Sequence, residues 1–167
     1  MATVEVQDND RLYRQILGEV AKLRHASVTI GVHQSAGVHG DGPETVAQIA
    51  ATHEFGSAAQ RIPERSFLRS TVDGNPKPMM EAQKAAGEVC RGKLTAEHCV
   101  ERIGVVTRDA VKETILSKIP PPLSPATVQR RLEKGKHGGG ALSMSDLTTP
   151  LKDSGQLIAS IQFEAKL

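Results

Sequence analysis

Apolar residues recur at helical spacing near the start of the chain, and the spacing then changes to two. The helical part covers residues 8–24 and predicts an amphipathic helix whose apolar stripe is formed by Leu12, Ile16, Val20 and Leu23. Residues 27–33 alternate instead, with Val28, Ile30 and Val32 on one side. This alternation predicts a strand with one apolar face.

The last nine residues alternate in the same way. Residues 159–167 place apolar side chains at every second position: Ala159, Ile161, Phe163, Ala165 and Leu167. This pattern is typical of a half-buried strand, so we expect residues 159–167 to join residues 27–33 in one small antiparallel or mixed sheet. Before this strand, Asp153 and Gln156 have the spacing of a capping box at the start of a short helix.

The remaining chain is predicted to be mostly helical. A long helix is expected near residues 95–118, with Thr95 as its N-cap and one broad apolar stripe: Cys99, Ile103, Val106, Ala110, Val111 and Ile115. Three prolines after Ile119 end it. Shorter helices are expected from Asp41–Glu44 to Gly56, near 66–72, over 79–91, and from Ser124 to Gly135. The predicted class is α+β, with residues 1–167 forming a single domain.

One segment combines His53, Glu54, Phe55 and Gly56 with the later run Arg61–Arg69. It contains two of the three phenylalanines in the chain, Phe55 and Phe67. We therefore expect a turn that both aromatic rings anchor, with Gly56 ending the preceding helix.

The His-Glu pair also begins a zinc-protease pattern, which requires a second histidine one helical turn later. Ser57 occupies that position, so the sequence predicts no metal site. The glycine-rich stretch within residues 135–148 lacks the order of glycine and lysine of a phosphate loop. We expect a mobile loop there and no bound cofactor.

Arginines recur at positions 61, 65 and 69, every four residues through this segment. They are interpreted either as local structure, paired with Glu64 and Glu54, or as anchors of an interface. Local structure is favoured, because Pro63 interrupts a helix that would align all three.

Several short motifs in this order resemble one family. The chain reads His53-Glu54-Phe55-Gly56, then Ile62-Pro63-Glu64-Arg65-Ser66-Phe67-Leu68, and near its end Leu151-Lys152-Asp153-Ser154-Gly155-Gln156-Leu157. Between them lies a long helix followed by the proline-rich break Ile119–Thr127. In this order and spacing, the chain resembles the tail-completion, neck or virion-morphogenesis proteins of tailed bacteriophages.

The resemblance implies a structural, non-enzymatic virion protein at the head-tail junction. Such a subunit is assembled in the host cytoplasm into a ring around the DNA channel, with a hexamer as the expected stoichiometry. It contacts neighbouring neck, connector and tail-tube proteins and meets the DNA without sequence specificity. The residues implied to form its structural or interface motif are His53, Glu54, Phe55, Gly56, Ile62, Pro63, Arg65, Phe67, Leu68, Asp153, Gly155 and Leu157.

Composition leaves alternatives open. The 167 residues carry 21 basic and 19 acidic side chains, a net charge of +2 that is small for a dedicated DNA-binding protein. A small DNA-binding module and a metal-dependent hydrolase remain alternative interpretations. With no tryptophan, the core must be built from aliphatic residues, which favours stability gained by association. No apolar run is long enough for a transmembrane helix, and Cys90 and Cys99 are expected to be free thiols.

Overall fold

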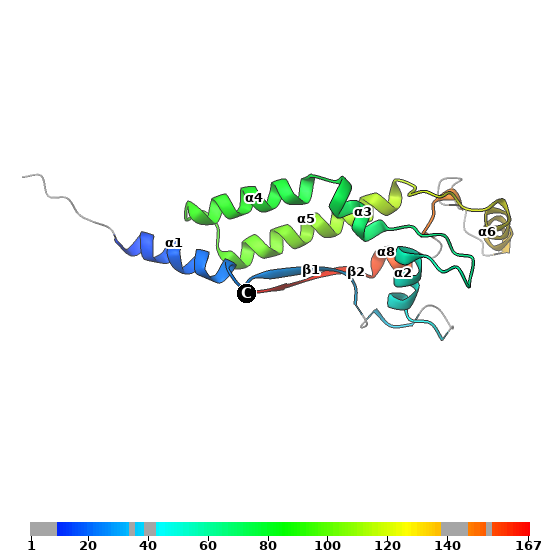
Figure 1. Cartoon of the computed structure of the whole chain (residues 1–167), viewed down its shortest axis with the longest axis horizontal. Coiled ribbons are helices and arrows are strands. Elements are labelled where there is room, and N and C mark those ends of the chain that lie inside the picture. Colours follow the sequence, from blue (N-terminus) through cyan, green and yellow to red (C-terminus); the bar gives the residue numbers. More distant parts are fainter. Residues whose placement is uncertain (1–9, 34–35, 39–42, 138–146, 153–154) are drawn as a thin grey trace, which may run out of the picture.

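The computed structural model describes residues 10–33, 36–38, 43–137, 147–152 and 155–167. Its sheet has two antiparallel strands, β1 (Ser27–Val32) and β2 (Ile161–Lys166), from the two ends of the chain. Helix α1 precedes β1, helices α2 to α6 lie between the two strands in sequence, and the short helix α8 (Gln156–Ala159) precedes β2 (Figure 1). The predicted α+β class is therefore confirmed.

The long helix α5 (Ala96–Leu116) lies along one face of this sheet (Figure 1). The register pairs Ile30 with Phe163 and Val32 with Ile161, so the apolar side chains of both strands face α5. Gly104 of α5 lets the Phe163 ring approach, because a Cβ there would meet the ring at 2.3 Å. The predicted N-cap is confirmed: Thr95 Oγ1 accepts from the N–H of His98.

Two helices cover one end of α5. α4 (Lys77–Cys90) runs beside α5, and α1 (Asp10–Leu23) packs against both. Their shared apolar cluster has Ala85, Val89 and Cys99 at its centre. Val20 and Leu23 of the predicted stripe pack against this cluster, but Leu12 is 54% exposed and α1 has no fully buried residue. Cys99 is buried and Cys90 is exposed, and both are free thiols.

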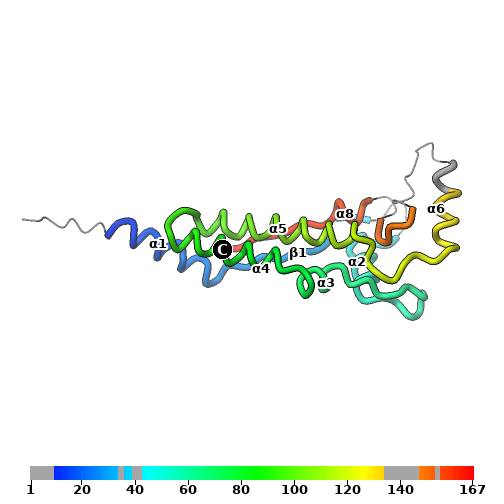
Figure 2. Tube along the Cα trace, turned by 90° about the horizontal axis from the view of Figure 1, so that it is seen from above, coloured from blue at the N-terminus to red at the C-terminus, as the bar shows by residue number. Residues whose placement is uncertain are grey.

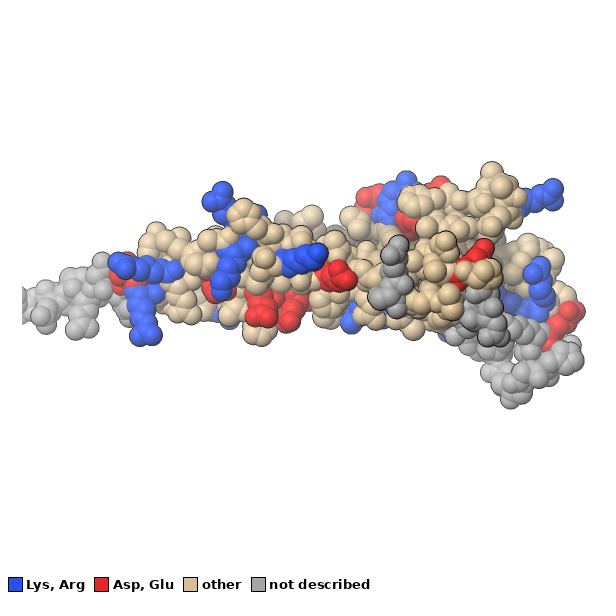
Figure 3. All heavy atoms as spheres, turned by 90° about the horizontal axis from the view of Figure 1, so that it is seen from below, with Lys and Arg blue, Asp and Glu red and all other residues tan. Residues whose placement is uncertain are grey.

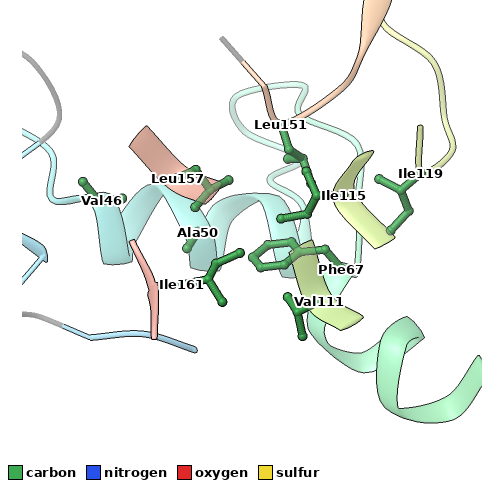
Figure 4. Packing of buried hydrophobic residues seen from close by; sticks show 9 residues of the cluster. All are labelled: Val46, Ala50, Phe67, Val111, Ile115, Ile119, Leu151, Leu157 and Ile161. Atoms are coloured by element: carbon green, nitrogen blue, oxygen red, sulfur yellow. The ribbon is translucent and has the colours of Figure 1, made fainter. Parts of the chain in front are cut away.

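The larger core lies at the other end of α5. It joins α2 (Val46–Phe55), α3 (Phe67–Gly74), α5, α8 and β2 (Figure 4). Its buried members are Val46, Ala50, Phe67, Val111, Ile115, Ile119, Leu151, Leu157 and Ile161. Residues far apart in the sequence therefore meet around Phe67, which is fully buried.

Several predicted element boundaries are wrong. α2 begins at Val46 rather than within Asp41–Glu44, because Thr45 and Gln48 form a capping box in which each side chain accepts from the other residue's N–H. α6 (Pro125–His137) passes through Gly135, where an end was predicted.

The C-terminal prediction also needs correction. Ala159 belongs to α8 and not to the strand, because Ser160 N–H still bonds to the carbonyl of Gln156 at 2.9 Å. The N-cap of α8 is Gly155, with φ at 79°, so the predicted cap at Asp153 is wrong. Asp153 lies outside the described residues, as does most of the predicted mobile loop within 135–148, namely residues 138–146.

The molecule is elongated (Figures 1 and 2). α1 lies at one end, whereas α2 and α6 lie near the other. Within the described ranges, no helix is both long enough and apolar enough to cross a bilayer.

Candidate functional site

The carboxylate of Glu54 lies at the N-terminus of the next helix, α3. Glu54 is only 5% exposed and accepts hydrogen bonds from the N–H groups of Leu68 and Arg69, at 2.9 and 3.1 Å. It also accepts from the hydroxyl of Ser66, at 2.7 Å. The first N–H groups of a helix lack partners within the helix, and the helix dipole favours a negative charge there. The side chain of Glu54, a residue of α2, therefore caps the N-terminus of α3.

Gly56 permits the tight turn between these two helices. Its φ of 73° lies in the region that favours glycine, and it ends α2 as predicted. A Cβ on Gly56 would lie 2.8 Å from the backbone nitrogen of Glu64. Ser57 and Ile62 then bond to each other through both backbone groups, at 2.8 and 2.9 Å. The turn is therefore held mainly by backbone contacts.

Arg65 connects this turn to the proline-rich segment. Its backbone N–H donates to the carbonyl of His53 at 2.7 Å. Its guanidinium donates from Nε to the carbonyl of Pro121 at 2.9 Å and from Nη2 to that of Pro122 at 3.2 Å. Because the side chain is 5% exposed, burial lowers the pKa of Arg65, and the nearby Arg131 lowers it further. Arg65 therefore fixes a segment that has no regular secondary structure.

The two aromatic residues of this segment have different roles. Phe67 is fully buried in the larger core and anchors α3, and Leu68 packs against the same core. Phe55 is 73% exposed, so the prediction that it pins the turn is wrong. The physical reason is that Phe55 is the last residue of α2, whose buried side is formed by Val46, Ala50 and Glu54.

The other two arginines lie on the surface. Arg69 pairs with Glu64 at 2.6 Å, and both side chains are more than half exposed. Arg61 is exposed and has a φ of 53° in the turn. The favoured interpretation of local structure agrees with the contacts of Arg65 and Arg69. The predicted arginine pairing with Glu54 is replaced by hydrogen bonds from backbone N–H groups.

Two sequence signatures carry the resemblance, the first within residues 53–68 and the second within residues 151–157, and both line one cavity of about 500 Å³. His53, Ile62, Pro63 and Arg65 come from the first signature, whereas Gly155 and Leu157 come from the second. The remaining walls come from α2, the turn after Gly56, the proline-rich segment, α6 and the segment before α8: Val46, Ile49, Arg61, Pro121, Pro122, Leu123, Ser124, Thr127, Arg131 and Leu151. Of the described residues of the predicted motif, Glu54, Phe55, Gly56, Phe67 and Leu68 do not line this cavity.

His53 faces this cavity in a positively charged environment. Its Nδ1 is buried and has no hydrogen-bond partner in the described part of the chain. Desolvation lowers the pKa of His53, and the charges of Arg65 and Arg131 lower it further. The imidazole is therefore held in its neutral form. No group of three or more histidine, cysteine or acidic residues arranged to hold a metal occurs among the described residues.

Arg131 was not expected from the sequence to contribute to this region. It donates from Nη1 to the carbonyl of Thr149 at 2.9 Å and joins α6 to the segment before Leu151. No motif marks it, because arginine on an exposed helix is common. The buried Thr149 and Pro150 beside it give no periodic signal either.

The chain matches no family model, and it matches no curated protein and no solved structure.

Proposed function

We propose that this chain is a non-enzymatic structural subunit of a tailed phage, located at the head-tail junction as a tail-completion or neck protein. It acts by assembling into a ring, with six copies expected, through which the DNA passes. Its partners are further copies of itself and the neighbouring connector and tail-tube proteins.

The observation that carries the proposal is that the two signatures meet around one cavity. Motifs that resemble a family in sequence order alone could coincide by chance. Here His53, Ile62, Pro63 and Arg65 lie in space beside Gly155 and Leu157. This meeting supports treating the motifs as one unit, and it supports the resemblance on which the function rests.

The chemistry of the first signature supports a structural role. The charged groups of Glu54 and Arg65 bind backbone N–H groups and carbonyls. A group that acts in catalysis must instead be positioned to reach a reacting atom. The polar side chains of this signature hold helices and turns in place, as an assembly subunit requires.

The surface supports assembly over dedicated DNA binding. Figure 3 shows basic and acidic side chains interspersed on one face, and the described residues of this face form no continuous basic stripe. A DNA-binding module gathers its positive charge on one surface. A ring lumen through which DNA slides requires no such stripe, because tight binding would oppose passage.

Electron microscopy of the purified chain in negative stain tests the proposal. We expect closed rings with a central opening. Isolated particles without rings at every concentration tested, together with a salt-dependent shift of duplex DNA, would instead support the DNA-binding alternative.

A further inference from the structure

Helix α1 exposes apolar side chains that its own chain does not cover. Tyr13 is 61% exposed and Leu17 is 48% exposed, one helical turn apart on the same side of the helix. Arg24 follows Leu17 by seven residues, close to two helical turns, and lies exposed in the turn after α1, where its N–H bonds to the carbonyl of Ala21. The stripe Tyr13, Leu17 and Arg24 is therefore an apolar surface with a positive charge at one end.

An apolar groove of about 560 Å³ lies elsewhere on the molecule, between β1, α2, α3 and α5. Leu68, Val72 and Ile30 line it, and Phe55 stands at its rim. Phe55 is 73% exposed and Val72 is 68% exposed. Exposed apolar side chains that gather around a groove mark an interaction surface more often than scattered ones do.

The charges of the two surfaces are complementary. Asp73 lines the groove beside Val72 and is exposed, as is Arg24 on the stripe. Neither forms an ion pair within the part of the chain that the structure describes. Two other charged residues line the groove: Arg69 pairs with Glu64, and the buried Glu54 accepts from the N–H groups of Leu68 and Arg69. The groove therefore offers an unpaired negative charge, and the stripe offers an unpaired positive one.

The stripe and the groove lie on different parts of an elongated chain. α1 packs on α4 and α5 at one end, whereas α2 lies near the other (Figure 1). A second copy of the chain carries the matching surface, because each copy has one stripe and one groove. A contact between two different surfaces of identical subunits generates a ring where the rotation closes.

We propose that α1 of one copy lies in the groove of the next copy, with Tyr13 and Leu17 against Phe55 and Val72 and with Arg24 facing Asp73. An amphipathic helix in an apolar groove is a common mode of recognition. The proposal rests on the proposed function, because it supplies the contact between neighbouring subunits of the ring. It also gives a role to Phe55, which the fold of the single chain leaves exposed.

Disulfide trapping between copies tests this contact. Leu17→Cys and Val72→Cys are made in separate chains, each with Cys90→Ser to remove the exposed native thiol, and the two chains are mixed under mild oxidation. We expect a covalent dimer in the mixture and none from either variant alone. Arg11→Cys, which lies on another side of α1, replaces Leu17→Cys in the control mixture and should give no dimer.

Two results of the trapping experiment would overturn the proposal. A dimer from Leu17→Cys alone would show that α1 meets α1, and the absence of a dimer from the mixture would show that the groove is not its site. Rings that form without the trapped dimer would leave the proposed function standing and remove this contact. A trapped dimer without rings would support this contact and contradict the proposed function.

Exchange of the two charges gives an independent test. Arg24→Asp and Asp73→Arg should each weaken self-association by about tenfold or more, because like charges then face each other across the contact. Mixing the two variants should restore association, since every stripe can then meet a groove of opposite charge. Undiminished association of both single variants would contradict the contact.

Discussion

At the scale of single residues, buried charge in the first signature stabilises backbone rather than another side-chain charge. Glu54 and Arg65 are both about 5% exposed, yet neither forms a salt bridge within the described ranges. Glu54 accepts from N–H groups at the start of α3, and Arg65 donates to the carbonyls of Pro121 and Pro122. A buried charge is tolerated where hydrogen bonds replace its lost water.

Glu54→Ala should therefore lower the free energy of unfolding. The change removes the carboxylate that caps α3 and leaves N–H groups of Leu68 and Arg69 without their acceptor. Hydrogen bonds to a charged group contribute about 1.5 to 3 kcal/mol, so we expect a loss of about 2 to 3 kcal/mol in urea unfolding. Glu64→Ala, which removes an exposed pair, is the control and should cost less than about 1 kcal/mol. Equal effects of the two would contradict the capping role.

Gly56 and Gly155 provide a matched pair of glycine substitutions. Both have positive φ, but only at Gly56 would a Cβ meet backbone, at 2.8 Å from Glu64 N, whereas nothing lies within 4 Å at Gly155. Gly155→Ala should cost about 1 kcal/mol through the backbone conformation alone. Gly56→Ala adds the clash, and the ψ of 170° at Gly56 lies in a region that is nearly restricted to glycine, so this change should cost about 2 kcal/mol or more. Thermal unfolding compares them, and an equal loss would show that the turn relaxes freely.

His53 makes stability depend on pH. Burial and the charges of Arg65 and Arg131 lower its pKa below the ordinary value of 6.5, so the unfolded chain binds the proton more readily. Stability should therefore fall as pH drops below about 6.5 toward the lowered pKa, and it should not change from this source at higher pH. His53→Gln should remove this contribution to the loss of stability at low pH. His25→Gln, which changes an exposed histidine, should retain it. Parallel pH profiles for wild type and His53→Gln would contradict this assignment.

At the scale of elements, the contact between α5 and the sheet depends on a glycine inside the helix. Phe163 fills the space over Gly104, and the guanidinium of Arg108 lies 5.9 Å from the ring centre. Glycine normally weakens a helix, but here a larger residue would displace the ring.

Gly104→Ala should therefore destabilise the protein even though alanine favours helix. The new Cβ would lie 2.3 Å from Phe163, and overpacking of this kind costs about 1 to 3 kcal/mol. Gly87→Ala on α4 meets only the flexible end of Arg91, at 3.4 Å, and should be neutral or stabilising by up to about 1 kcal/mol. Chemical unfolding of both variants checks this, and a stabilised Gly104→Ala would show that α5 does not press on Phe163.

The sequence predicted most elements, because their patterns are local. The period of two over Val28–Val32 and the stripe on α5 survive in the fold with only small shifts of their ends. The predicted start of a helix is wrong where a nearby residue, rather than the expected one, forms the N-cap. Thr45 with Gln48 replaced the start at Asp41–Glu44, and Gly155 replaced Asp153.

The candidate site was only partly predictable. The sequence indicated that His53, Arg65, Gly155 and Leu157 belong together through a resemblance, but not that they would line one cavity. The exposure of Phe55 was missed because its burial depends on which side of α2 meets the core. The contacts of Arg65 with the proline carbonyls were missed as well, since nothing local connects residues so far apart.

At the scale of the whole molecule, the fold leaves surfaces that association would cover. Within the described residues the sheet has two strands, so each strand has one edge without a strand neighbour. Tyr13, Leu17, Phe55 and Val72 remain exposed on the elongated body. A small chain with an aliphatic core gains stability when such surfaces are buried against further copies.

Native mass spectrometry of the purified chain over a range of concentrations shows directly whether the chain forms a closed ring. We expect one dominant closed assembly with six times the 17.9 kDa mass of the single chain. A closed assembly keeps this mass as the concentration rises, whereas an open chain of subunits continues to grow. A mass that stays at that of the monomer at every concentration would contradict the ring.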